Sequence, residues 1–171
     1  MKLYLIGFMG CGKSAYGQQL AQQLNWDFVD LDERVTEQAG TSIAELFEQE
    51  GEESFRQWEQ QALYSTAPLT YTVIATGGGT PCFQENLDWL KEHGTTIYLK
   101  MLPDKLVKRL KKEQQLRPLL KGMRQKALQQ FVHQKLAERA YYYLQADIVI
   151  DPVDLPAKAL KSYLSEVMFK A

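Results

Sequence analysis

The chain has 171 residues, of which 45% are hydrophobic and 24% are charged, and its net charge is -1. This length favours one domain with its own core, and the composition is ordinary for a globular protein. The near-neutral charge argues against general nucleic-acid binding, and no apolar run reaches the length of a membrane span. Two cysteines, Cys11 and Cys82, form no metal-binding spacing, which favours a reduced, cytoplasmic setting.

Short apolar runs predict buried β-strands, because they are rich in β-branched and aromatic residues and are bounded by Gly, Asp or Pro. In chain order they are KLYLIGF, DFVDL, TVIAT, TTIYLK and DIVID. Longer amphipathic stretches separate them. The alternation predicts a parallel sheet covered by helices on both faces, with ligands at the carboxyl ends of the strands.

Helix signals lie between the predicted strands. They are helical spacing at Tyr16, Leu20 and Leu24 before Asn25, a Ser42–Glu45 capping box with a stop at Gly51, a stop at Gly94 and a start at Pro103. A long helix is expected from about Gln125 to Gln145, and PAKALKSYLSEVMFK is expected to form the last one.

The first predicted strand leads into a glycine-rich turn, GFMGCGKS, that matches the pattern G-x-x-x-x-G-K-[ST]. Its glycines let successive backbone N–H groups point at an anion, and the helix that begins near Lys13 adds its positive N-terminus. Lys13 is therefore expected to reach the β- and γ-phosphates of a triphosphate, and the Ser14 hydroxyl to ligate Mg²⁺. A flexible strand-to-helix turn is the alternative.

Two carboxylates end the second predicted strand, in Asp30-Leu31-Asp32. Alternation along the strand sends Asp30 and Asp32 to the same face. One carboxylate can then support the water shell of Mg²⁺, and the other can accept the proton of a substrate hydroxyl. A base of that kind typically contributes about 10²–10⁴-fold in rate. The alternative is a solvated strand end in which Asp32 caps the next helix.

Three consecutive glycines follow the third predicted strand, in TGGGTP, and they are costly unless something must approach the backbone closely. Arg56 lies in the amphipathic stretch FRQWE, and Arg139 lies late in the long helix, in ERAYYY. An arginine offers a planar fork that matches a carboxylate, although each of these two can also be a surface residue. The nearby aromatic residues are expected in the core; they are Phe55, Trp58 and Tyr141–Tyr143.

The segment 100–126 holds ten of the 20 basic residues against two acids. Its centre, EQQLRPLLKG, contains a proline and a glycine and has a weak helical pattern. A basic segment beside a phosphate site predicts a lid, over about residues 111–124, that delivers Arg117 to the transferring phosphoryl group. A solvated basic face is the alternative.

The motifs occur in the order GFMGCGKS, DLD, FRQWE, TGGG, RPLL and ERAYYY. As an ordered set they resemble the shikimate kinase family over nearly the whole chain. The resemblance implies an α/β fold of three α/β/α layers with a central five-stranded parallel sheet, a P-loop kinase of the nucleoside monophosphate kinase type. It implies one domain over residues 1–171, with substrate-binding helices over about 32–63. The implied reaction is ATP-dependent phosphorylation of the shikimate 3-hydroxyl in aromatic amino-acid biosynthesis.

For ATP and Mg²⁺, the resemblance implies that the phosphate-binding residues are Gly10, Cys11, Gly12, Lys13, Ser14 and Ala15. Arg109 is implied to stack on adenine and Arg117 to meet ATP from the lid. Ser14 is implied to ligate the metal, and Asp30 is implied to support it through water. The loop DPVDLPAK after the last strand has no arginine, whereas some relatives place one near adenine.

For the acceptor, the resemblance implies that Asp32 holds the reacting hydroxyl and takes its proton. Arg56 and Arg139 are implied to clamp the shikimate carboxylate and Gly78 to approach its hydroxyls, and Gly79 is also expected to bind the substrate. The implied catalytic residues are Asp32, Lys13 and Arg117.

Two other functions stay open as alternatives. Another small-molecule P-loop kinase is one, since gluconate also carries a carboxylate and hydroxyls, although the TGGG and FRQWE contexts favour shikimate. A nucleotide-binding switch is the other, but the N-K-x-D guanine-binding motif typical of such switches is absent from the sequence. The expected partners are ATP and shikimate, with no nucleic acid and no membrane, and the expected state is a monomer.

Overall fold

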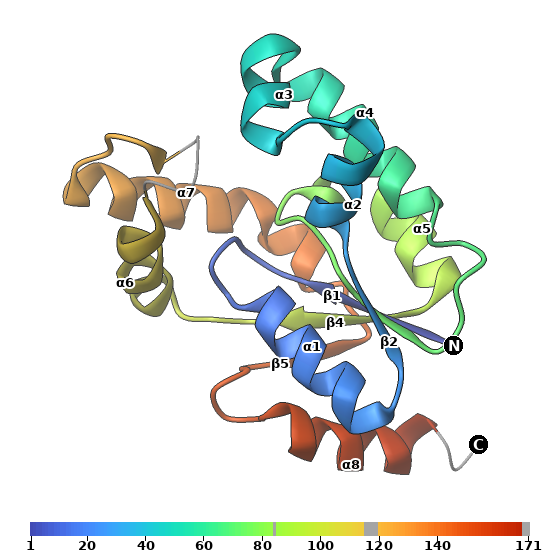
Figure 1. Ribbon diagram of the computed structural model, residues 1–171. Coiled ribbons are helices and arrows are strands. Elements are labelled where there is room, and N and C mark those ends of the chain that lie inside the picture. Colours follow the sequence, from blue (N-terminus) through green and yellow to red (C-terminus); the bar gives the residue numbers. More distant parts are fainter. Residues whose placement is uncertain (84, 115–119, 169–171) are drawn as a thin grey trace.

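The structure is a computed structural model that describes residues 1–83, 85–114 and 120–168 (Figure 1). It contains a sheet of five parallel strands in the order β2-β3-β1-β4-β5. The strands are β1 (Lys2–Ile6), β2 (Asp27–Asp30), β3 (Thr72–Ala75), β4 (Thr95–Leu99) and β5 (Ile148–Ile150). Each lies within one of the five predicted runs, so the predicted sheet is confirmed.

The described helices are α1 (Lys13–Leu24), α2 (Leu31–Ala39), α3 (Ile43–Gln49), α4 (Gly51–Tyr64), the 3₁₀ turn η1 (Thr80–Cys82), α5 (Asn86–His93), α6 (Pro103–Glu113), α7 (Gln125–Tyr143) and α8 (Ala157–Met168). The predicted helix signals hold. Asn25 caps α1 in a left-handed conformation with φ 58°, and the Ser42–Glu45 capping box starts α3. Within the described residues, no helix combines the length and apolar character needed to cross a membrane.

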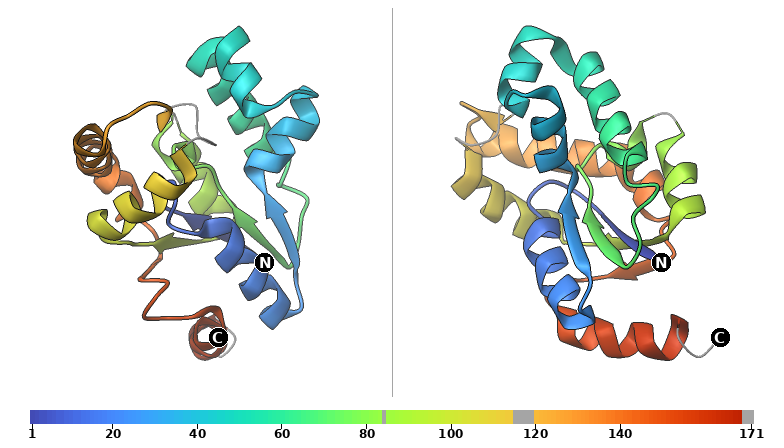
Figure 2. Two further views of the ribbon diagram at one scale, coloured as in Figure 1. Left: turned by 60° about the vertical axis from the view of Figure 1, so that its left-hand side comes forward. Right: turned by 45° about the vertical axis from the view of Figure 1, so that its right-hand side comes forward.

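Side-chain alternation along β1 distributes the helices over the two faces of the sheet. Leu5 faces α1, where a Cβ built on Gly17 would lie 3.0 Å from the Leu5 side chain, so glycine allows this close approach. The Tyr4 ring points to the opposite face and packs edge-on against Trp89 of α5, with ring centroids 6.1 Å apart. α8 packs beside α1 (Figure 2). The result is the predicted three-layer α/β/α arrangement.

The adjacent strands β2, β3 and β1 bring the sequence motifs to one edge of the sheet. In the register of these strands, Asp30 pairs with Ala75, and Ala75 pairs with Leu5. Three features therefore leave the sheet side by side. They are the Asp30 carboxylate, the glycine segment after β3 (residues 77–79) and the glycine-rich turn after β1 (residues 7–14), which we call the phosphate loop. Helices α2, α3 and α4 stand above this edge (Figure 1).

The region after β2 differs from the prediction that the strand continues to Asp32. β2 ends at Asp30, and α2 begins at Leu31. Asp30, not Asp32, is the N-cap, because its carboxylate accepts a hydrogen bond of 3.0 Å from the Asp32 amide. Strand alternation is therefore not what places the two aspartates on the same side, although both line the same cavity.

The predicted aromatic core is only partly confirmed. Phe55 is buried and Trp58 packs against the core from a half-buried position. Tyr143 has no exposed surface, whereas Tyr141 is 72% exposed. Successive helical residues point about 100° apart, so three consecutive tyrosines of α7 cannot share one buried face.

Candidate active site

The phosphate loop joins β1 to α1. Gly10 and Gly12 have φ angles of 78° and 95°, which favour glycine over other residues. The Lys13 ammonium is buried and donates to the carbonyls of Gly7 at 2.8 Å and Phe8 at 3.2 Å. No described side chain caps the start of α1, so its first N–H groups can face an anion.

A cavity of about 440 Å³ lies beside this loop. Its lining includes Lys13, Ser14 and Ala15 at the start of α1 and Arg109 and Lys112 of α6. The Arg109 guanidinium lies near the loop, with Nη1 3.4 Å from the carbonyl oxygen of Gly10. Cationic groups from both elements therefore line this cavity, while stacking of Arg109 on adenine stays a prediction.

Ser14 and Asp30 form an oxygen pair at the start of α1. The Ser14 hydroxyl donates to Oδ2 of Asp30 at 2.5 Å. No group of three or more His, Cys, Asp or Glu side chains suited to a metal occurs among the described residues. Mg²⁺ usually binds through few protein oxygens, waters and substrate phosphates, so this sparse pair fits it.

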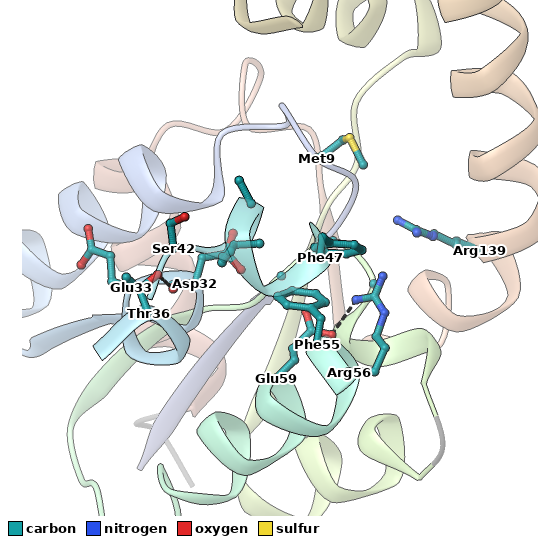
Figure 3. A pocket seen from close by; sticks show the side chains of 15 residues that line it. Met9, Asp32, Glu33, Thr36, Ser42, Phe47, Phe55, Arg56, Glu59 and Arg139 are labelled. Carbon is teal, nitrogen blue, oxygen red and sulfur yellow. Dashed lines mark hydrogen bonds and ion pairs between the residues drawn. The ribbon is translucent and has the colours of Figure 1, made fainter. Parts of the chain in front are cut away.

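A second cavity has a volume of about 460 Å³ (Figure 3). Asp32 of α2, Arg56 of α4 and Arg139 of α7 line it, together with the glycine segment after β3. Asp32, Gly78 and Met9 line both cavities. Asp32 therefore lies at the boundary between the cavity beside the glycine loop and a cavity that contains two arginines.

The two arginines differ in how they are paired. Arg56 donates to Glu59 at 2.6 Å and to Glu52 at 3.1 Å. Burial lowers the pKa of Arg56, but the charges and hydrogen bonds of Glu59 and Glu52 outweigh it, so the pKa is raised and the group stays cationic. Nη1 of Arg139 is buried without a hydrogen-bond partner among the described residues. Such an unpaired donor is costly, and an anionic ligand would satisfy it.

Each glycine after β3 lies against a different group. A Cβ built on Gly77 would lie 2.1 Å from Oε1 of Glu59, and one on Gly79 would lie 2.5 Å from Nη1 of Arg56. A Cβ on Gly78 would lie 3.1 Å from the backbone nitrogen of Met9 in the phosphate loop. The three glycines thus let α4 and the phosphate loop approach the same backbone from different sides.

Glu59 is a site residue that the sequence reasoning missed. It is 1% exposed, accepts from Thr80 Oγ1 at 2.7 Å and also pairs with Arg56. It therefore holds the Arg56 guanidinium and the start of η1 in one network. The i,i+3 spacing of Arg56 and Glu59 on a helix was the available signal.

We expect Glu59→Gln to destabilise the protein by up to about 3 kcal/mol, because it leaves the buried Arg56 cation without its closest counter-charge. The apparent KM for the ligand of the second cavity should rise as well. Urea unfolding and steady-state kinetics measure the two effects. Glu52→Gln is the matched control, since its side chain is 63% exposed and exposed pairs contribute about 0–1 kcal/mol. Equal effects of the two variants would contradict the assignment.

The remaining predicted residues are placed as follows. Cys11 is buried within the phosphate loop, and its sulfur lies 3.9 Å from the Lys13 ammonium. Arg117 belongs to residues 115–119, which lie outside the described part of the chain. Cys82 is a free, half-buried cysteine, and burial raises the pKa of its thiol to about 11 against the opposing effect of Arg139 and Arg56. Cys82 is therefore a protonated thiol at neutral pH.

The parallel sheet with strand order β2-β3-β1-β4-β5 and the glycine loop after its central strand define a P-loop kinase fold of the nucleoside monophosphate kinase type. A sequence model of the family described as shikimate kinase matches residues 9–168. The chain belongs to the shikimate kinase family, and it is an ATP-dependent kinase.

Individual relatives and solved structures support this family assignment. The shikimate kinase of Bacteroides thetaiotaomicron is 37% identical over 155 residues, which cover 91% of this chain and 89% of that protein. A 1.7 Å crystal structure of shikimate kinase from the same organism superposes with a TM-score of 0.90 at 34% identity, covering 99% of this chain and 98% of the other. Shikimate kinase from Acinetobacter baumannii in complex with shikimate gives a TM-score of 0.87 at 30% identity, covering 99% and 93%. A gluconokinase from Sinorhizobium meliloti shares only the fold, with a TM-score of 0.58 at 16% identity.

Proposed function

We propose that this chain transfers the γ-phosphoryl group of ATP to the 3-hydroxyl of shikimate, which gives shikimate 3-phosphate and ADP for aromatic amino-acid biosynthesis. The observation that carries the proposal is the position of Asp32 at the boundary of the two cavities. An acceptor hydroxyl held by Asp32 would face a triphosphate held by the phosphate loop. Such a juxtaposition is what in-line phosphoryl transfer requires.

The acceptor is bound in the cavity of about 460 Å³. Its carboxylate lies between Arg56 and Arg139, where it supplies the missing partner of Arg139 Nη1. Its hydroxyls meet the backbone of Gly78 and Gly79. The apolar side of the cavity includes Phe55, which suits the carbon ring of shikimate.

Catalysis follows from positioning and charge neutralisation. Asp32 accepts the proton of the attacking hydroxyl, and the Lys13 ammonium binds the β- and γ-phosphates. Ser14 would ligate Mg²⁺ and Asp30 would support it through water, and the bound ion would supply positive charge beside the phosphates. Arg117 reaches the transferring phosphoryl group from the lid.

The chain acts as one unit over residues 1–171, with acceptor-binding helices over about 32–63 and a lid over about 111–124. Two contacts of this segment are described. The side-chain amide of Gln114 donates to the carbonyl of Leu120 at 2.8 Å and to that of Met123 at 2.6 Å, so it connects the end of α6 with residues 120–123. We place the protein in the cytoplasm as a monomer.

The test is a reaction of the purified protein with ATP, Mg²⁺ and shikimate, followed by identification of the product by ³¹P NMR and mass spectrometry. We expect shikimate-dependent release of ADP and one equivalent of shikimate 3-phosphate. Gluconate is the matched alternative acceptor, and water alone gives the background. Faster ADP release with gluconate than with shikimate, or no acceptor-dependent release, would overturn the proposal.

A further inference from the structure

Tyr143, the last residue of α7, makes a contact with the glycine segment that the proposed mechanism does not use. It is fully buried, and its hydroxyl donates to the carbonyl oxygen of Gly78 at 2.5 Å. Its ring stacks on Tyr98 of β4, with centroids 5.0 Å apart and planes 27° apart. Burial raises the pKa of Tyr143, although the charge of Arg139 and a side-chain hydrogen bond with it lower the pKa. The hydroxyl therefore stays protonated and can donate.

The contact fixes a peptide unit that borders both cavities. The Gly78 carbonyl and the Gly79 N–H belong to one planar peptide, and the described chain contains no cis peptide bond. In a trans peptide these two groups point in opposite directions, so a fixed carbonyl also fixes the direction of the N–H. Two glycines in succession otherwise give this backbone unusual freedom. Gly79 lines the cavity that contains Arg56 and Arg139.

We infer that Tyr143 is a positioning residue for the acceptor: by holding the Gly78 carbonyl, its hydroxyl orients the Gly79 N–H to donate to a hydroxyl of the bound substrate. The inference rests on the proposed function for the identity of that substrate. Arg139 lies one helical turn before Tyr143, so the same face of α7 would bind the acceptor carboxylate and orient the backbone donor.

Tyr143→Phe tests this inference, because it removes only the hydroxyl and keeps the ring that stacks on Tyr98. We expect the KM for shikimate to rise roughly five- to tenfold, the fold-change of one lost hydrogen bond, with the KM for ATP unchanged. The ¹⁵N resonance of Gly79 in the substrate-free protein should shift as well, since a hydrogen bond to a carbonyl polarises the following peptide nitrogen. Tyr141→Phe, at a 72% exposed position of the same helix, is the matched control and should change neither.

Three results would overturn the inference. They are an unchanged KM for shikimate in Tyr143→Phe, an equal rise in both KM values, and an unchanged Gly79 resonance. An equal rise would indicate a packing role, which the melting temperature of the variant would also register. A wild-type protein that does not phosphorylate shikimate would instead overturn the proposed function. The Gly79 resonance would still decide whether Tyr143 orients this peptide, because that measurement requires no substrate.

Discussion

Replacing Asp32 with asparagine is expected to lower kcat by about 10²–10⁴-fold, the usual contribution of a positioned base, while ATP binding stays close to that of the wild type. The amide keeps the size of the carboxylate but cannot accept the proton of the attacking hydroxyl. Asp32 lines both cavities, whereas most residues proposed to bind the triphosphate belong to the loop after β1 and the start of α1. Proton transfer and ATP affinity are therefore expected to separate in this variant.

The kinetic constants follow from ADP release at saturating shikimate, and calorimetric titration gives the affinity for ATP. Glu33→Gln is the matched control, because Glu33 is the neighbouring carboxylate on α2 and lines only the second cavity. We expect this control to keep most of its kcat. Undiminished turnover in Asp32→Asn would remove Asp32 from its role as base, and parallel losses in both variants would indicate a general effect of negative charge.

The sheet could be predicted from the sequence because its strands read as short apolar runs, and the three inner strands β1, β3 and β4 are almost entirely buried. The helix ends were visible for a similarly local reason, since Asn25 and the Ser42–Glu45 box act on backbone groups within a few residues. The end of β2 could not be predicted from the sequence. DFVDL has a strand-like composition through Leu31, yet the Asp30 carboxylate caps a helix that begins directly after it.

The sequence predicted which residue types form the site, but it did not predict most of the contacts between them. The glycine segment indicated a close approach, but the sequence did not say that Glu59, Arg56 and the Met9 backbone are the groups that approach. A buried glutamate looks like an exposed one in the sequence. Its burial depends on partners from two separate segments, Arg56 in α4 and Thr80 in η1.

Replacing Arg139 with alanine is expected to raise the apparent KM for shikimate by about 30-fold or more, because truncating one member of a buried, hydrogen-bonded charge pair costs roughly 2–5 kcal/mol. The loss should fall on the acceptor and not on ATP. Arg56 already pairs with Glu59 and Glu52 in the substrate-free protein, whereas Nη1 of Arg139 has no described partner. Nη1 of Arg139 is thus the donor that the substrate alone would satisfy. Steady-state kinetics with shikimate and ATP varied in turn would measure the two KM values separately.

Arg139→Lys is a useful second variant, because it keeps the positive charge but loses the planar guanidinium that binds a carboxylate through two hydrogen bonds. If the fork matters, the lysine variant should recover only part of the lost affinity. Thermal unfolding adds a readout that is independent of turnover: shikimate should raise the Tm of the wild type by binding the native state and should have little effect on Arg139→Ala. A variant that keeps the full shikimate-dependent rise in Tm would show that Arg139 does not hold the carboxylate, and Arg56 alone would then have to bind it.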